Sequence, residues 1–97
     1  MIDYVQNTEE NFSEWLCNIC ETYEIKASQL ARAISTKERK VNRSTISLWR
    51  SDQRLPSCAL RVRLAVYLAE QEVDCFNQLI REILWRVHVS EWRSENA

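Results

Sequence analysis

The residues best suited to contact another molecule lie in one run, V-N-R-S-T-I-S-L-W-R-S-D, from Val41 to Asp52. Arginine binds phosphates and guanine edges, hydroxyls bond to either, and an aliphatic side chain can meet a thymine methyl group. One side of a helix over this run presents those residue types together: Arg43, Ser44, Ser47, Leu48 and Arg50. The run therefore predicts a helix, residues 43–51, that reads base edges in a DNA groove.

The same run supplies the residues that would hold such a helix in place. Asn42, which we also count among the candidate DNA-binding residues, is a favourable N-cap. Val41, Ile46 and Trp49 fall on the opposite side at helical spacing. We expect Trp49 to pack in the core beside Ile46 rather than to stack on a base. An ordinary amphipathic surface helix has the same periodicity, so the run alone leaves both interpretations open.

Charge is segregated along the chain, although the net charge is only −1. Residues 1–25 carry six acids and no Lys or Arg, residues 26–63 carry ten Lys or Arg and two acids, and residues 64–97 carry six acids and three Arg. A basic middle segment between acidic ones predicts a nucleic-acid footprint on one face. The candidate phosphate contacts are Lys37, Arg39, Lys40, Arg50 and Arg54.

Four cysteines raise the alternative of a metal or redox site, because Cys17 and Cys20 form a C-x-x-C pair. There is no second such pair, and the single histidine, His88, is distant in sequence. We therefore expect small buried thiols and no metal or cofactor. The chain also lacks a glycine-rich loop and a nucleophile beside a base, so we expect no enzyme.

Composition predicts an all-α fold in a single domain, because the 97 residues include no glycine and one proline, and hairpin turns depend on glycine. No apolar run approaches the roughly 18 to 20 residues of a membrane span. The start, Met1-Ile2-Asp3, has neither the basic nor the apolar region of a signal peptide. The expected location is the cytoplasm.

Apolar periodicity and capping residues divide the chain into five helices. The first expected helix runs from near Glu9, capped by Asn7 or Thr8, to about Glu24, and the second covers Ser28–Ile34. The third follows the Asn42 cap, and the fourth runs from the Ser57 cap to about residues 70–73. The fifth runs from Cys75, capped by Asp74, to about Trp92. The polar, charged sequence of residues 35–40 predicts a turn or a helix extension. Pro56 disfavours helical backbone at the residue before it, so the third helix must end before the fourth begins.

The last helix carries two apolar stripes. Phe76, Leu79 or Ile80, Ile83 and Val87 form the first, and Trp85, Val89 and Trp92 form the second. So large an exposed aromatic surface is unfavourable in a monomer, so the second stripe predicts a homodimer or higher oligomer. The alternative is that the stripe folds back onto the first helix near Trp15 and completes a monomer core.

The order of these pieces resembles the helix-turn-helix domain of the lambda repressor and Cro-like family over roughly residues 12–70. The matching residues are Leu30-Ala31, Val41 to Ser47, Pro56-Ser57, Leu64-Ala65 and Leu68. The I-S-x-W run and the later L-A-V are also similar to phage transcriptional activators of the cII type. Two features depart from the family: about five extra residues without glycine between Ile34 and Val41, and Ala27 where the family often has a polar residue.

The resemblance implies a five-helix domain in which residues 9–73 bind DNA, residues 74–93 form an oligomerisation helix, and residues 1–8 are a tail. The leading hypothesis is a phage or bacterial transcriptional regulator that reads double-stranded DNA in the major groove, with RNA polymerase as a further candidate partner. The alternative is a protein-binding adaptor or antitoxin-like module on the same scaffold. The acidic first helix and the inserted residues favour that alternative.

Overall fold

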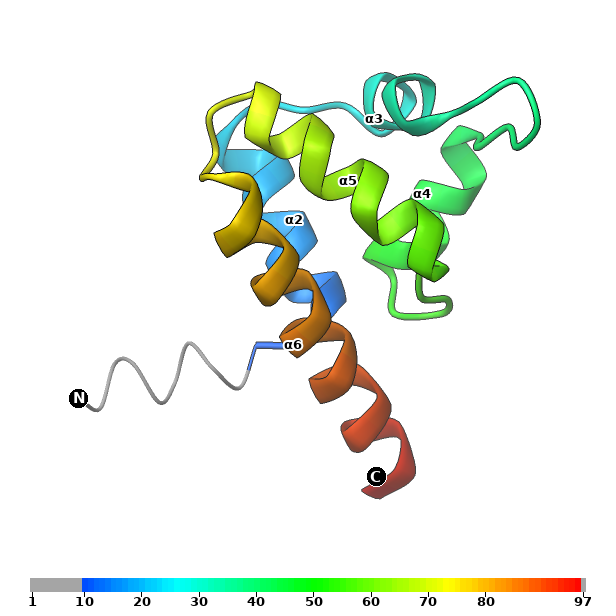
Figure 1. Ribbon diagram of the computed structural model, residues 1–97. Coiled ribbons are helices and arrows are strands. Elements are labelled where there is room, and N and C mark those ends of the chain that lie inside the picture. Colours follow the sequence, from blue (N-terminus) through cyan, green and yellow to red (C-terminus); the bar gives the residue numbers. More distant parts are fainter. Residues whose placement is uncertain (1–9, 97) are drawn as a thin grey trace.

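The computed structural model describes residues 10–96, and this part of the chain is all-α, as the composition predicts. Its helices are α2 (Phe12–Thr22), α3 (Ala27–Ile34), α4 (Arg43–Arg50), α5 (Cys58–Glu70) and α6 (Phe76–Asn96). In Figure 1, α6 runs beside α2 and α5, while α3 and α4 lie on the side away from α6. The long last helix is therefore a flank of the molecule rather than its centre.

One hydrophobic core joins the five helices. α6 packs against α5 and α2, α4 packs against α2 and α3, and α3 also packs against α5. The largest fully buried side chains are Phe12, Leu16, Leu30, Ile34, Ile46, Trp49, Pro56, Leu64, Leu68, Leu79, Ile83 and Val87. Because α2 touches both α4 and α6, it links the two ends of the packing.

The start of the first described helix differs from the prediction. We predicted a helix from near Glu9; the predicted caps Asn7 and Thr8, like Glu9 itself, lie outside the described residues, and α2 begins at Phe12. Its N-cap is Asn11, whose Oδ1 accepts the Glu14 amide at 3.0 Å, while Glu14 Oε1 accepts the Asn11 amide at 3.0 Å. This reciprocal capping box satisfies two amides that a helix start otherwise leaves unpaired.

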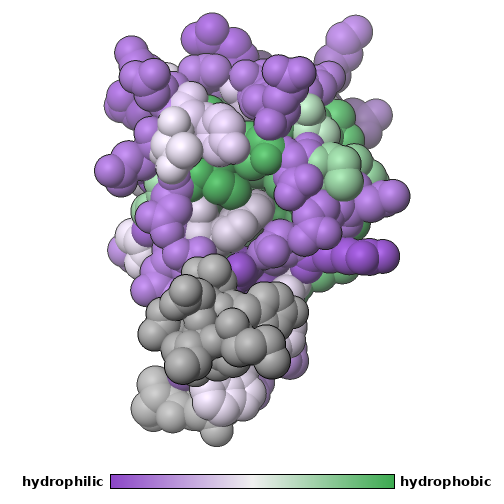
Figure 2. Space-filling view, turned by 90° about the vertical axis from the view of Figure 1, so that its left-hand side faces the viewer, coloured by the Kyte–Doolittle hydropathy of each residue, from purple (hydrophilic) through white to green (hydrophobic). Residues whose placement is uncertain are grey.

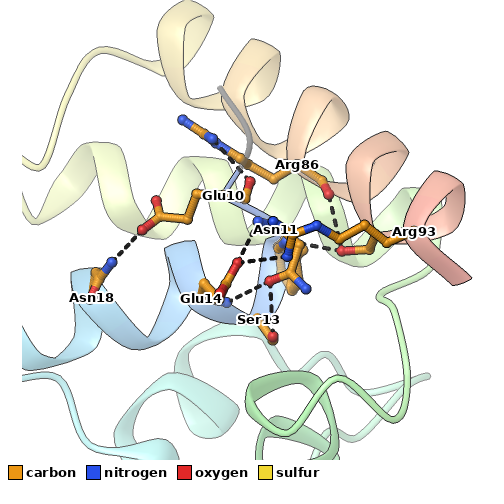
Figure 3. Close-up of polar contacts among 9 residues, drawn as sticks. Glu10, Asn11, Ser13, Glu14, Asn18, Arg86 and Arg93 are labelled. Carbon is orange, nitrogen blue, oxygen red and sulfur yellow. Dashed lines mark hydrogen bonds and ion pairs between the residues drawn. The ribbon is translucent and has the colours of Figure 1, made fainter. Parts of the chain in front are cut away.

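A group of polar contacts, drawn in Figure 3, attaches the start of α2 to α6. The buried Phe12 amide donates to Ser90 Oγ at 2.9 Å. Arg86, also buried, donates to the Glu10 carbonyl at 2.9 Å and pairs with Glu82 at 3.0 Å. Buried polar groups are stable only when bonded, so these contacts fix where α2 meets α6.

A surface ion pair adds to this junction. Arg93 reaches Glu14 Oε1 at 3.0 Å, and both side chains are about half exposed. The hydrogen bond from the Asn11 backbone amide, helped by Arg93, lowers the pKa of Glu14 below its ordinary value. The charged carboxylate is therefore the form that caps α2.

Three helices end without glycine by placing an ordinary residue in the left-handed region. Glu24, Asp52 and Glu72 have φ of 54°, 63° and 59° and follow α2, α4 and α5. After α2 and α5, the next backbone amide donates to the carbonyl five residues earlier: Ile25 to Cys20 at 2.8 Å and Val73 to Leu68 at 3.1 Å. These are Schellman motifs, in which glycine is the usual residue at the left-handed position.

The other boundaries are close to those predicted. α3 begins at Ala27 and α5 at Cys58 after the Ser57 cap, although the Ser57 hydroxyl makes no capping bond. α6 begins at Phe76 and continues to Asn96, beyond the predicted end near Trp92. Asp74 does accept the Cys75 amide at 2.8 Å.

The first predicted stripe of α6 is right at its centre and wrong at its start. Leu79, Ile83 and Val87 are buried, and Ile80 packs against the core at its edge. Phe76, however, is 38 % exposed, because it opens the helix at the margin of the packed surface. The burial of α6 therefore begins at its second turn.

Replacing Glu72 with glycine is expected to raise the free energy of unfolding by about 0.5–1 kcal/mol, because glycine removes the Cβ clash of a positive φ. Urea denaturation measures this directly. The matched control is Gln71→Gly, one residue earlier, where φ is −84°. Glycine relieves no clash there and only increases the conformational entropy of the unfolded chain, so this variant should lower the free energy of unfolding. Equal stability of Glu72→Gly and the wild type would contradict the expectation.

Candidate nucleic-acid interface

Helix α4 is held by its inner face and open on its outer face, as the sequence predicts. Ile46 and Trp49 are fully buried, and the Trp49 ring meets Phe12 edge-on at 6.3 Å between ring centroids. Asn42 is the N-cap, with Oδ1 accepting the Thr45 amide at 3.0 Å. The assignment of Trp49 to the core is confirmed.

The outer face carries most of the predicted base-reading residues. Arg43, Ser44, Ser47 and Arg50 are exposed, whereas Leu48 is half-buried. Leu48 is less accessible because the chain turns back over the end of α4, where the Gln53 amide donates to the Leu48 carbonyl at 2.9 Å. The predicted base-reading residues are therefore most accessible in the N-terminal half of α4.

The last turn of α4 faces α2. Cys17 Sγ donates to the Arg50 carbonyl at 3.5 Å, so this end of α4 is tied to the first described helix. Arg50, the predicted phosphate contact that lies on α4, is thus at the end of the helix opposite the Asn42 cap.

Residues 35–42 form an ordered loop, so of the two structures expected for residues 35–40 the turn is right and the helix extension wrong. Ser35 is its centre: its hydroxyl accepts the Val41 amide at 2.8 Å and donates to the Ala31 carbonyl at 2.8 Å. Thr36 and Arg39 close a smaller turn inside it, with Thr36 N–H donating to the Arg39 carbonyl at 2.8 Å. The inserted residues thus have a defined shape.

Arginines of α5 and the loop brace this connection. Arg63 donates to the carbonyls of Ile34 at 2.7 Å and Ser35 at 3.3 Å. Arg39 donates to Ser57 Oγ at 3.1 Å, which accounts for the missing side-chain cap of α5. Sequence reasoning missed Arg63, because its bonds to residues 28 and 29 positions away depend on how α5 packs against α3.

A shallow hollow lies between α3 and the N-terminus of α4. It is lined by Ser28, Ala31, Arg32, Ser35, Thr36, Lys40, Val41, Asn42 and Arg43. Its three basic side chains, its hydroxyls and the positive end of the α4 dipole together suit a phosphate group. Arg32 was not among the predicted contacts; its position in the last turn of α3, just before the loop, is the signal that could have found it.

The remaining predicted contacts divide into two groups. Lys37, Arg39 and Lys40 are exposed in the loop, which Figure 1 shows projecting at the end of the molecule opposite the α5–α6 connection. Arg54 instead lines a surface depression with Glu91, Arg93 and Glu95 of α6. The structure therefore groups Lys37, Arg39 and Lys40 beside α4 and places Arg54 on another part of the surface.

The four cysteines are free thiols, with Cys17 half-buried, Cys20 buried, and Cys58 and Cys75 exposed. Burial raises the pKa of Cys20, which keeps that thiol protonated. Within residues 10–96, no group of three or more His, Cys, Asp or Glu could hold a metal ion. None of the helices in that range is long and apolar enough to cross a membrane.

Comparison of the chain with protein-family models, curated proteins and solved structures finds no match. The features of the chain that bear on function are therefore the outer face of α4, the 35–42 loop and the hollow between α3 and α4.

Replacing Ser35 with alanine is expected to lower the free energy of unfolding by about 1–2 kcal/mol, because it leaves the partly buried Val41 amide unpaired. Chemical denaturation of the variant and of Ser28→Ala, an exposed serine of α3, gives the comparison. If both variants unfold at the wild-type denaturant concentration, Ser35 does not hold the loop.

Proposed function

We propose that the protein is a sequence-specific DNA-binding transcriptional regulator that places α4 in the major groove. The observation that carries this proposal is the division of α4 into a buried face of Ile46 and Trp49 and an exposed face of Arg43, Ser44 and Ser47. A helix fixed by its inner side holds its outer side chains in a defined orientation, which base reading requires.

The distribution of charge supports the same surface. Arg32, Lys40 and Arg43 line the hollow beside α4, and Lys37 projects from the adjacent loop. The acids lie mainly on α2, on α6 and at the C-terminal end of α5. Positive potential is thus concentrated where α4 would meet DNA, while the acidic remainder limits non-specific binding.

The geometry gives the side chains different roles. Arg43, Ser44 and Ser47 would contact base edges, with Leu48 contributing only its exposed part. The phosphate contacts would come from Arg32, Lys37, Arg39 and Lys40, which are all exposed. Asn42 uses its carbonyl oxygen as a cap, so its amide group is what it could offer to DNA.

One reading helix covers few base pairs, so we further propose that the regulator acts on double-stranded DNA as a homodimer or higher homo-oligomer. Such a regulator would act in the cytoplasm and affect RNA polymerase at its target site.

The second candidate is a protein-binding adaptor or antitoxin-like module. It is favoured by the acids on the exposed side of α2, which include Glu14, Glu21 and the adjoining Glu24. The two functions differ in one simple measurement, since an adaptor that has lost DNA binding does not retard random duplex DNA even at low salt.

Arg43→Ala is expected to weaken binding to a selected operator by about 1–3 kcal/mol and to relax specificity at one base pair, because Arg43 projects from the first turn of α4. The operator is first selected from a random duplex pool, and affinities are then measured by fluorescence anisotropy. Arg54→Ala is the matched control, since it removes the same side chain beside the acidic end of α6. Equal losses for both variants, or none for Arg43→Ala, would remove Arg43 from base reading.

Replacing Lys37, Arg39 and Lys40 together with alanine is expected to weaken binding to all sequences alike. The slope of log affinity against log salt should become shallower by about two to three, because each phosphate contact releases roughly one counterion. Titrations at several salt concentrations, on operator and random duplex, measure the slope. A wild-type slope in this variant would show that the loop points away from DNA.

A further inference from the structure

A groove lies between α2 and α6, on the side of the molecule away from α3. Its walls contain Trp15, Ile19, Tyr23, Val73, Leu79 and Trp85, and its polar rim contains Glu10, Asp74, Gln78, Arg81, Glu82 and Arg86. The groove encloses about 780 Å³, which is within the usual range of binding pockets. Figure 2 shows hydrophobic residues exposed in the middle of this side of the molecule, between hydrophilic ones.

The outer face of α6 is apolar next to this groove. Leu84, Trp85 and Trp92 are 51 %, 45 % and 58 % exposed. Trp85 belongs to both features, because it also lines the groove, and its ring lies 5.7 Å from that of His88. The apolar face and the groove are therefore one continuous surface.

The predicted oligomer stripe of Trp85, Val89 and Trp92 needs one correction. Val89 is only 8 % exposed, so it faces the interior of the chain rather than a partner. The exposed side chains on this side of α6 are instead Leu84, Trp85, His88 and Trp92, which we call the outer α6 face.

We propose that two copies of this chain pair with their α6 helices antiparallel, so that Trp92 of each copy enters the α2–α6 groove of the other. A single large aromatic side chain inserted into an apolar pocket is the usual anchor of a protein interface. Each copy then both inserts its Trp92 and receives the Trp92 of the other, so both copies use the same surface, as a two-fold symmetric dimer requires.

The spacing along α6 supports this register. When two antiparallel helices cross at Trp85, a residue seven positions after Trp85 lies opposite one seven positions before it. Trp92 therefore lies opposite Gln78, which lines the groove. Both are about 10.5 Å, or two helical turns, from Trp85 and on the same side of the helix.

Charge complementarity supports the antiparallel direction. Arg81 lies on the groove rim, and Glu91 lies one residue before the anchoring Trp92. In the antiparallel register, Arg81 of each copy comes near Glu91 of the other, giving two equivalent opposite-charge contacts. A parallel arrangement would instead set Arg81 beside Arg81 and Glu91 beside Glu91.

The contact goes beyond the proposed DNA binding, because it needs no DNA and can be measured without it. It also leaves the outer face of α4 uncovered, since α4 and the 35–42 loop lie on the side away from α6. Failure of the dimer and failure of DNA binding are therefore separate outcomes.

The test is sedimentation equilibrium of the full chain in the absence of DNA. The wild type is expected to dimerise at micromolar concentration, and Trp92→Ala to raise the dissociation constant at least tenfold. Val62→Ala, which shortens an apolar side chain of α5 that is 46 % exposed, is the matched control and should leave the dissociation constant unchanged. Circular dichroism melts establish that each variant is folded.

A charge exchange tests the register itself. Arg81→Glu and Glu91→Arg should each weaken dimerisation several-fold, and the double variant should restore it, because both residues are exposed and the pairs are re-formed with reversed sign. A wild-type monomer at tens of micromolar would overturn the proposal, whether the groove then holds the first nine residues of the chain or another protein. Undiminished dimerisation of Trp92→Ala, or no recovery in the double variant, would overturn it as well.

Discussion

The position of Phe12 is the constraint on which the rest of the structure depends. The centroid of its fully buried ring lies 6.0 Å from that of Trp15 and 6.3 Å from that of Trp49. Its backbone amide donates to Ser90 Oγ of α6 at 2.9 Å. One residue therefore joins the inner face of α4 to α6, two helices that do not otherwise pack closely. A shift of α2 would change both the orientation of the outer face of α4 and the width of the groove between α2 and α6.

The 35–42 loop joins α3 to α4 without glycine and over more residues than the 23–26 connection between α2 and α3. Ser35 and Arg63 supply the backbone groups of that longer segment with partners. For the proposed phosphate contact this means that the bonded loop holds Lys40 at a fixed place beside Arg43, since both line the same hollow.

The sequence predicts the features that depend on local helical periodicity. It does not predict those that depend on contacts between segments distant in the chain. The inner and outer faces of α4, the Asn42 cap and the core position of Trp49 all follow from helical spacing. The start of α2 does not, because Asn11 with Glu14 makes the observed capping box while Asn7 or Thr8 with Glu10 offers a similar pattern earlier in the chain. Helical spacing also groups Val89 with Trp85 and Trp92, yet the body of the protein covers only Val89. Arg63, Arg32 and the position of Arg54 depend on contacts between segments distant in sequence, which periodicity does not report.

α6 has two different faces: one packs against α2 and α5, and the other is exposed and carries the proposed dimer contact. Arg86, Ser90 and Arg93 face α2 and bond to Glu10, Phe12 and Glu14. The outer α6 face turns another way, and Trp85 on it also lines the groove between α2 and α6. If the proposed dimer forms through that face, a substitution such as Trp92→Ala leaves the hydrogen bonds of Arg86, Ser90 and Arg93 to the start of α2 in place. The outer face of α4 then keeps its geometry, since α2 packs against both α4 and α6.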